Sequence, residues 1–576
     1  MESWWYTEPM HIDVVPNRGS RPAYLLREAW REGKKIRKRT LANLSSLSDE
    51  QIDAIRRALK GEKLAPVSEM FEVVASRIHG DTDAVLATMK RLGMRELLSS
   101  RPAFEAEVVM GMIAARVVAP HTKLATTRWW RTRTLPQDLS IEHATEDDLY
   151  QAMDWLLDHQ ESIEKKLAAR HLKNGGLALY DLTSSYFEGT TCSLAAMGHN
   201  RDGKRNKLQV NYGLLADKRG CPVAVSVYKG NTNDPKTLMP LVEKLKKGYG
   251  IERVVLVGDR GMIGQAAVED LRKVPGLEWI TALKSTQIRA LVEGGALQLG
   301  LFDEKNLLEL THPDYPGERL VACRNAELGK LRGHKRQALL EATTEDLKKV
   351  RGMVSRGDLR GAGKIGVRVG RVVNKYKVAK HFELTIENDR FEFALRDDSI
   401  VAEAALDGIY VVRTSLTKKE MSAPDAVRSY KSLSEVERAF RSIKTVDLEV
   451  RPIHHRLADR VRAHIFLCML AYYVEWHMRE AWRPILFADE DLAAKAVRDP
   501  VAPAKRSDAA EAKAETKVLA DGTPVHSFRT ALADLSTIVR NTCRTPAAPT
   551  APTFAVVTTP TAEQQRALDL LTQIEV

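Results

Sequence analysis

Two short apolar segments, Leu177-Ala-Leu-Tyr-Asp181 and Val254-Val-Leu-Val-Gly-Asp259, each run into an aspartate. Segments that are apolar at every position are typical of central strands in a sheet covered on both faces. An ionised carboxylate is costly in such surroundings unless it is paired or binds a metal ion. The two segments therefore predict a covered sheet that presents an acid at the end of each of two strands.

A third acid, Glu437, lies far downstream on an amphipathic helix that we predict around residues 430–444. Tyr430, Glu437 and Lys444 are spaced by seven and would share one helical stripe, so we expect Glu437 to face the core. Three acids from two strand ends and a helix would form an oxygen-rich site suited to Mg²⁺ and phosphoryl transfer. An alternative stays open, because Ser434 and Glu437 could form a capping box that makes the glutamate structural.

The order of elements after Asn174 is typical of a ribonuclease H-like fold. Three strands come first, followed by a helix, a strand, a second helix and a last strand. The strand candidates are Leu177–Asp181, Leu208–Ala216, Pro222–Tyr228, 253–258 and Trp279–Leu283. We therefore predict an α/β protein with a ribonuclease H-like mixed-sheet catalytic core. About 150 residues separate Lys284 from the Glu437 helix, which is too long for a loop and predicts an inserted subdomain.

Changes in composition divide the chain into five parts. They are a helical, basic N-terminal DNA-binding region (1–172), the first part of the catalytic core (173–284), an inserted β-rich subdomain (285–415), the last part of the core with the glutamate-bearing helix (416–482), and a linker-rich, partly flexible C-terminal tail with short helices (483–576). The flexibility is expected from the Pro- and Thr-rich run at 544–553.

Charge and cysteine usage narrow the class of protein. The 576 residues carry a net charge of +12, which favours a polyanionic partner, either nucleic acid or a membrane surface. No stretch approaches the roughly 20 apolar residues of a membrane span, and the start lacks a signal-peptide pattern. Five dispersed cysteines without a Cys-x-x-Cys pair indicate reduced thiols in a cytoplasmic protein and argue against a zinc module. We expect nucleic acid and no membrane as the partner.

The densest cationic run lies near the N-terminus of the chain. It consists of Lys34, Lys35, Arg37, Lys38 and Arg39. Such a run can be a solvated face, but in a basic chain it favours contacts with DNA phosphates.

The spacing Tyr430-x2-Leu433-x3-Glu437-x6-Lys444 resembles the Y-x2-R-x3-E-x6-K signature of a group of DDE insertion-sequence transposases, the insertion-sequence-four-like group. The two strand-end aspartates resemble those of the same group, and further similar segments follow in the family's order. Leu433 departs from the pattern, since the signature has an arginine there. Arg438 or Arg441 could supply a DNA-binding cation nearby.

The resemblance implies Asp181, Asp259 and Glu437 as catalytic residues that hold two Mg²⁺ ions, with Mn²⁺ able to substitute. Water would first cut at the transposon end, and the freed 3′-hydroxyl would attack target DNA without a covalent protein–DNA intermediate. Tyr430 and Lys444 would grip the terminal phosphate. The implied partners are double-stranded DNA, as terminal inverted repeats and target, and a second copy of the chain in a homodimeric DNA complex. We expect it in the bacterial cytoplasm, associated with the nucleoid.

Two other functions stay open. A ribonuclease H-like DNA nuclease without strand transfer would carry the same three acids and would yield nicked but never joined DNA. A non-catalytic, transposase-derived DNA-binding protein should have lost an acid, and all three are present.

Overall fold

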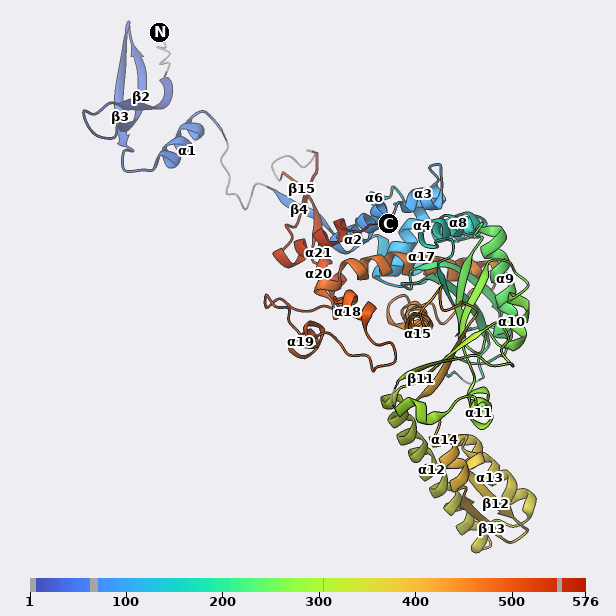
Figure 1. The fold of residues 1–576 in the computed structure, drawn as a ribbon. Helices are drawn as coiled ribbons and strands as arrows, with labels where there is room; N and C mark the ends of the chain where they lie inside the picture. The colour runs from blue at the N-terminus through green and yellow to red at the C-terminus, as the bar shows by residue number, and fades with distance from the viewer. Residues whose placement is uncertain (1–6, 63–70, 205, 304, 546–551, 576) are drawn as a thin grey trace. The chain divides into compact units, whose positions relative to one another are not determined.

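The computed structural model describes residues 7–62, 71–204, 206–303, 305–545 and 552–575. The chain forms two compact units, one of residues 1–76 with 540–558 and one of residues 77–539 with 559–576. Figure 1 follows the chain through both units from blue to red.

The first unit begins with an antiparallel sheet in the strand order β1-β2-β3. Its elements are β1 (Thr7–Val15), β2 (Ala23–Glu32), β3 (Lys35–Asn43) and the following helix α1 (Asp49–Leu59). Ser48 and Gln51 form a capping box at the start of α1. The prediction of a helical region from residue 1 is therefore wrong for residues 7–43. Glu32 pairs with Lys35, so Gly33 and Lys34 form a two-residue hairpin turn, with Gly33 at φ +63°.

A second small sheet in this unit joins distant parts of the sequence. Its strand order is β16-β15-β4. The strands are β4 (Glu72–Ile78), β15 (Val539–Arg544) and β16 (Phe554–Val557). The C-terminal tail thus supplies strands as well as helices, which the sequence did not indicate. The Pro- and Thr-rich run that we expected as a linker lies mostly outside the described residues.

The second unit is built on an eight-stranded sheet in the order β10-β11-β14-β9-β8-β5-β6-β7 (Figure 1). Five of its strands form the core: β5 (Leu177–Tyr186), β6 (Gln209–Asp217), β7 (Pro222–Lys229), β8 (Val254–Gly258) and β9 (Leu277–Ala282). Strands β5, β6 and β7 are antiparallel neighbours, whereas β8 pairs parallel to β5 and β9 pairs parallel to β8. This arrangement confirms the ribonuclease H-like fold. Short helices connect these strands, namely α9 (Leu238–Glu243), α10 (Gln265–Leu271) and α11 (Ser285–Glu293).

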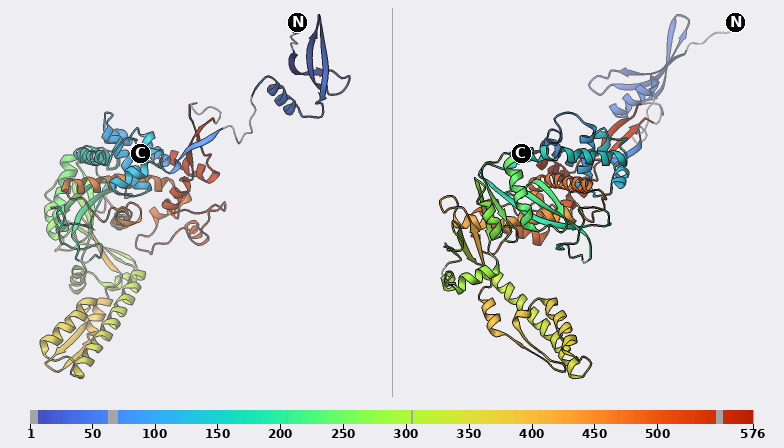
Figure 2. Two further views of the ribbon diagram at one scale, coloured as in Figure 1. Left: turned by 180° about the vertical axis from the view of Figure 1, so that it is seen from behind. Right: turned by 90° about the vertical axis from the view of Figure 1, so that its right-hand side faces the viewer.

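The insertion after β9 is mainly helical, which corrects the prediction of a β-rich subdomain. It contains β10 (Leu307–Leu310), β11 (Arg319–Arg324), α12 (Ala326–Ser355), α13 (Ala362–Tyr376), β12 (Phe382–Ile386), β13 (Phe391–Leu395), α14 (Asp397–Ala404) and β14 (Ile409–Thr414). Strands β10, β11 and β14 extend the main sheet. The α12–α14 part has a hydrophobic core of its own and extends away from the sheet (Figure 2). The sequence of α12 is rich in Ala, Leu, Glu, Lys and Arg, which favour helix.

Helices from both sides of the core surround the long helix α17 (Ala458–Ala481), in which residues 463–478 are all buried. The helices of the preceding region are α2 (Gly80–Arg91), α3 (Met94–Leu98), α4 (Phe104–Val118), α5 (Lys123–Trp130), α6 (Leu135–Asp138), α7 (Glu146–Asp158) and α8 (Gln160–His171). Helix α17 packs against β7 and against α2, α4 and α7. Helices α2 to α8 of the expected DNA-binding region are thus part of the second unit, because α4 is apolar on every side from Val108 to Ala115 and needs cover all round.

One observation bears on membranes. Among the described residues, no single helix is long and apolar enough to cross a bilayer, although α4 with α5 passes by length and composition as a pair bent by 90°.

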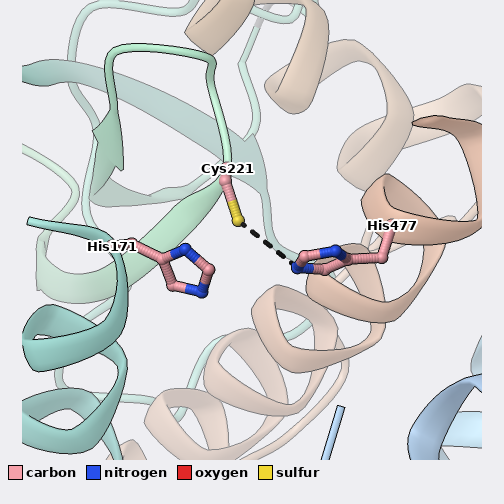
Figure 3. A group of neighbouring side chains, drawn as sticks. All are labelled: His171, Cys221 and His477. Carbon is pink, nitrogen blue, oxygen red and sulfur yellow. Dashed lines mark hydrogen bonds between the residues drawn. The ribbon is translucent and has the colours of Figure 1, made fainter. Parts of the chain in front are cut away.

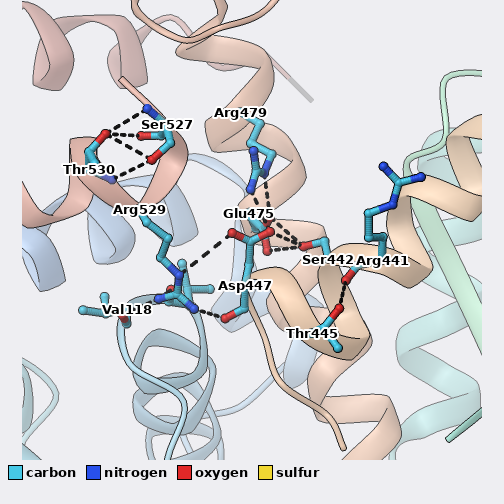
Figure 4. Close-up of polar contacts among 11 residues, drawn as sticks. Val118, Arg441, Ser442, Thr445, Asp447, Glu475, Arg479, Ser527, Arg529 and Thr530 are labelled. Carbon is cyan, nitrogen blue, oxygen red and sulfur yellow. Dashed lines mark hydrogen bonds and ion pairs between the residues drawn. The ribbon is translucent and has the colours of Figure 1, made fainter. Parts of the chain in front are cut away.

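Much of the C-terminal tail is folded onto the second unit. Its helices are α18 (Leu492–Val497), α19 (Asp508–Thr516), α20 (Phe528–Leu535) and α21 (Ala562–Thr572). The indole Nε1 of Trp482 donates to the carbonyl of Ala567 at 2.8 Å. Arg529 on α20 donates to the carbonyls of Val118 and Asp447, as Figure 4 shows. These contacts make the tail a part of the core and correct the expectation of a mainly linker-like segment.

Candidate active site

The two aspartates lie beside each other because their strands are parallel neighbours. Tyr180 of β5 is in register with Gly258 of β8, and each is followed by the aspartate. Only β8 ends there, since β5 continues past Asp181 to Tyr186 with β6 as its partner. Our expectation of two strand-end acids is therefore right for Asp259, whereas Asp181 lies within its strand. The site opens where β8 leaves the sheet and one edge of β5 loses its partner.

Glu437 reaches the same place on α16 (Leu433–Arg441), which packs on β5. The buried side of this helix is formed by Val436, Ala439 and Phe440, while Glu437 is exposed. The prediction of a core-facing Glu437 is therefore wrong. The capping-box alternative is also wrong, because the N-cap of α16 is Ser432 and no side chain caps the helix.

The regular stripe through Tyr430, Glu437 and Lys444 does not exist in the structure. Tyr430 lies on α15 (Ala423–Lys431), which ends before α16 begins. After Arg441 the chain forms a π-helical turn, η6 (Ser442–Val446). Residues spaced by seven share a face only in an unbroken helix. The two breaks explain why the register expected from the sequence is lost.

The three carboxylates interact electrostatically. Burial raises the pKa of Asp181 to about 6, and the negative charges of Asp259 and Glu437 add to this rise. The backbone N–H of Leu182, which donates to Asp181 Oδ1 at 2.7 Å, and the Arg201 guanidinium act in the opposite direction. Burial also raises the pKa of Tyr430 to about 12, with contributions from all three acids. The structure thus brings the three predicted acids and Tyr430 into one site.

A fourth acid, Asp234, lies next to Asp259 and was missed as a site residue. A Cβ built on Gly261 would lie 3.4 Å from Asp259 Oδ2 and 4.0 Å from Asp234 Oδ2. Arg201 holds Asp234 through both carboxylate oxygens, at 2.7 and 2.6 Å, and donates to the carbonyl of Leu182 at 2.6 Å. Arg201 therefore ties Asp234 to the strand that carries Asp181.

Lys444 is buried beside the site and forms an ion pair that the sequence did not indicate. Its Nζ lies 2.8 Å from Asp202 Oδ1, and Arg451 pairs with the same carboxylate. Burial lowers the pKa of Lys444, although Asp202 opposes this effect. Its expected contact with a DNA phosphate stays a prediction, as does that of the exposed Arg441.

The basic run near the N-terminus lies in the first unit, around the β2–β3 hairpin. All five cations are exposed. Three of them are paired with acids of the same sheet: Arg37 with Glu32, Lys38 with Asp13 and Arg39 with Glu28.

A basic groove of about 600 Å³ was also missed. Its cations are Arg260, Arg289, Arg332, Lys335, Arg336, Lys375, Lys377 and Lys380. Arg260 follows Asp259 directly, and the others come from α11, α12 and the segment around the end of α13. Since the cations are scattered along the sequence, only the fold gathers them into one surface.

Comparisons with known proteins show the family of this chain. A family model described as a transposase DDE domain matches residues 177–474, more than half of the chain. A model of the N-terminal domain of the IS1634 family of transposases matches residues 12–67. No curated protein matches the chain. A cryo-EM structure of the piggyBac transposase synaptic complex with hairpin DNA is similar with 8% identity and a TM-score of 0.34, covering 79% of this chain and 77% of that chain. That likeness is too weak to define the fold, which rests on strand order and the family match.

Proposed function

This chain belongs to the family of DDE transposases, and we propose that it binds the ends of an insertion sequence, cleaves the DNA and joins the freed 3′-hydroxyl to target DNA. We assign it to the Y-R-E-K group on the spacing of Tyr430, Glu437 and Lys444. The observation that carries the proposal is geometric: Asp181 and Asp259 follow paired residues of the parallel strands β5 and β8, and α16, which bears Glu437, packs on β5.

These carboxylates suit a hard divalent cation. They supply oxygen ligands of like charge, and a bound cation would reduce their mutual repulsion. We propose that Asp181, Asp259 and Glu437 hold two Mg²⁺ ions, for which Mn²⁺ would substitute. Such ions, when bound, would stabilise the attacking and leaving oxygens of an in-line displacement.

The neighbouring residues would position the acids and the DNA. The N–H of Leu182 fixes one oxygen of Asp181, and Arg201 fixes Asp234 beside Asp259. The raised pKa of Tyr430 keeps its phenol protonated at neutral pH, so it can donate a hydrogen bond to a phosphate and is a poor nucleophile. Lys444 would add a positive charge next to that phosphate.

We infer two DNA-binding surfaces. The basic groove would hold phosphates next to the acids, through cations such as Arg260, Arg332 and Lys335. The run from Lys34 to Arg39 would make screened contacts with further phosphates. We further propose that the complex contains two copies of the chain and acts in the bacterial cytoplasm on nucleoid DNA.

The runner-up is a ribonuclease H-like nuclease that does not join strands. It would use the same acids, so the products must decide. A non-catalytic DNA-binding role is less well supported, because the site retains all three acids together with Tyr430.

The test uses the full chain with a DNA fragment that carries the sequences flanking its reading frame on both sides, together with a supercoiled target plasmid. We expect Mg²⁺-dependent cleavage at both flanks and a product in which fragment and plasmid are covalently joined. Cleavage without joined product would favour the nuclease. No cleavage in either Mg²⁺ or Mn²⁺ would refute the catalytic proposal.

The matched variants are Asp181→Asn and Asp270→Asn. Asp181→Asn should abolish both reactions and retain end binding in a gel-shift assay, because it removes a ligand without touching the DNA surfaces. Asp270 lies on α10 of the same core, where it pairs with Lys273 on the surface. Asp270→Asn should therefore react like the wild-type chain.

A further inference from the structure

A group of three potential metal ligands lies away from the carboxylates, at the turn between β6 and β7. It consists of Cys221 in that turn, His171 at the end of α8 and His477 on α17 (Figure 3). One ligand atom from each residue lies within 4.8 Å of the other two. Among the described residues, this is the set of His, Cys, Asp and Glu that meets this criterion. The three carboxylates of the active site are more widely spaced.

The distances are close to those of a zinc centre. Cys221 Sγ lies 3.8 Å from His477 Nε2. Zinc bonds of about 2.0–2.1 Å to nitrogen and 2.3 Å to sulfur in a tetrahedron would place these atoms about 3.5 Å apart. A shift of a few tenths of an ångström therefore brings this pair into range. Cys221 is fully buried and His477 is 4% exposed, so water does not compete strongly for either ligand.

The surroundings hold the ligands in place. One ring nitrogen of His171, Nε2, lies 3.0 Å from Tyr473 Oη, and the other, Nδ1, lies 3.4 Å from Arg219 Nη2. A guanidinium can only donate, so Nδ1 carries the lone pair and the proton sits on Nε2, facing the tyrosine. A metal ion bound at Nδ1 would replace the 3.4 Å contact of this nitrogen with Arg219, whose guanidinium keeps its ion pair with Asp217. A polar partner on the second nitrogen is the usual way to orient a metal-binding histidine.

The β6–β7 turn is organised around one buried carboxylate. Asp217 Oδ1 accepts the backbone N–H groups of Cys221, at 3.0 Å, and Arg219, at 2.8 Å. Its Oδ2 pairs with the Arg219 guanidinium at 2.8 Å, which offsets the positive charge closest to the three ligands. The carboxylate therefore fixes the position of Cys221 and reduces the repulsion that a cation would meet.

We propose that His171, Cys221 and His477 bind one Zn²⁺ ion as a structural centre that joins α8, the β6–β7 turn and α17. On binding, the Cys221 thiol would lose its proton to solvent and form a thiolate–zinc bond, with no change in oxidation state. The fourth position would be taken by water from the adjoining pocket of about 430 Å³, which Arg219, His477 and Glu480 line.

This proposal departs from the sequence-based argument against a zinc module. That argument relied on the absence of closely spaced cysteines, which applies to sites built from one local segment. Here one cysteine combines with two histidines, and Cys221 and His477 are 256 residues apart. The ligands come together only through the contact of β7 with α8 and α17.

The experiment is elemental analysis of the full chain, prepared without a histidine tag and dialysed against Zn²⁺-containing and then metal-free buffer. We expect about one zinc per chain in the wild type and at least a tenfold lower content in Cys221→Ser and His477→Asn. Cys192→Ser, which changes another buried cysteine, should retain zinc. Asp181→Asn should also retain it, because the carboxylate site is separate.

Cobalt provides a second readout that does not depend on the variants folding. Wild-type chain loaded with Co²⁺ should show a thiolate-to-cobalt charge-transfer band and tetrahedral d–d bands, and Cys221→Ser should lack the charge-transfer band. Absence of that band from the wild type would overturn the proposal. Equal zinc content in the wild type and in folded Cys221→Ser, checked by circular dichroism, would overturn it as well. Both outcomes leave the proposed transposase activity untouched.

Discussion

The core contains two clusters of acids, and they differ in how their charge is compensated. In the active site, the charges that act on Asp181 include two further carboxylates, while Arg201 is engaged with Asp234. In the second cluster, the buried carboxylates of Glu475 and Asp447 both pair with Arg479, at 2.6 and 2.8 Å (Figure 4). Ser442 Oγ lies within hydrogen-bonding distance of both carboxylates as well.

A raised pKa alone does not distinguish the two clusters. Burial raises the pKa of Asp181 to about 6 and that of Glu475 to about 7. The difference lies in the partners, because the second cluster holds its own cation and hydrogen-bond donor. A cluster whose compensation is incomplete is suited to binding a cation, whereas a compensated one is suited to holding helices together.

Removal of the shared cation should have the largest effect on stability. Arg479→Ala would leave Glu475 without its ion pair and Asp447 with the longer 3.9 Å contact to Arg529. We expect a loss of about 3 kcal/mol in the free energy of unfolding. Urea denaturation followed by circular dichroism measures this. Arg462→Ala, on the same helix with an exposed partner at Asp459, should cost less than about 0.5 kcal/mol. Similar losses in both variants would remove the contrast between the clusters.

A variant of Lys444 tests the proposed role of the active-site cluster in DNA cleavage. Lys444→Ala should slow single-turnover cleavage on the order of 10²-fold, because a misplaced phosphate no longer meets the reacting groups, while gel-shift affinity changes little. Lys207→Ala is a suitable control, since its exposed partner is Glu188. Normal cleavage by the Lys444 variant would leave this lysine with only its structural pairing to Asp202.

The pH dependence of the free energy of unfolding should reveal the raised pKa of the buried Glu475. The folded chain holds the proton of Glu475 more tightly than the unfolded chain, with a pKa of about 7 against an ordinary value of 4.5. This contribution to stability is therefore present at low pH and is lost as the pH rises through this window, by about 3 kcal/mol. Glu475→Gln should flatten that part of the stability profile, measured by urea denaturation at several pH values. An unchanged slope would contradict the raised pKa.

The basic β2–β3 hairpin allows a similar comparison between cations that form an ion pair, such as Arg37, and cations for which the described residues show none, such as Lys34 and Lys35. Lys34→Ala with Lys35→Ala should weaken DNA binding at every sequence and reduce the salt dependence by roughly one unit of slope per lost contact. Arg37→Ala should have a smaller effect, because its guanidinium already pairs with Glu32 at 2.9 Å. Binding titrations over a range of salt concentrations measure both. An equal change in slope would show that the ion pairs on the sheet do not compete with DNA.

The smallest expected effect is a gain in stability at the active site. Without divalent metal at neutral pH, Asp181→Asn should stabilise the chain by about 1 kcal/mol, because it removes one of several repelling charges. The gain should disappear when Mg²⁺ is added, since only the wild type gains stability from the ion. A loss of stability in metal-free buffer would indicate that Asp181 is compensated in the way Glu475 is.

The sequence was sufficient for the parts of the fold that depend on local pattern. The apolar runs that end near Asp181 and Asp259 gave the central strands, and the order of elements gave the sheet. The N-terminal sheet was missed because the charges of β2 and β3 hide the strand pattern, and only pairing across the hairpin accounts for them. Breaks on either side of α16 could not be predicted either, since they depend on packing against β5 and α17 rather than on helix propensity.

The sequence likewise predicted the three acids as candidate site residues, because each follows or interrupts a regular pattern of apolar residues. Arg201, Asp234 and the cations of the groove were not predicted, because their roles arise from distances between segments that the sequence does not order. The proposed zinc ligands His171, Cys221 and His477 could not be predicted for the same reason, since they come from three separate segments.

The pairing of β4 with β15 affects how the chain folds while the ribosome synthesises it. Glu72 on β4 and Arg544 on β15 form an ion pair across 472 residues of sequence. At about 5–20 residues per second, a ribosome needs roughly 25–90 s to deliver the second strand after the first. During that time β4, with Val73 and Val74 exposed, is an unprotected strand edge of the kind that promotes aggregation. The rate of translation through the core should therefore influence how much of the chain reaches its folded state.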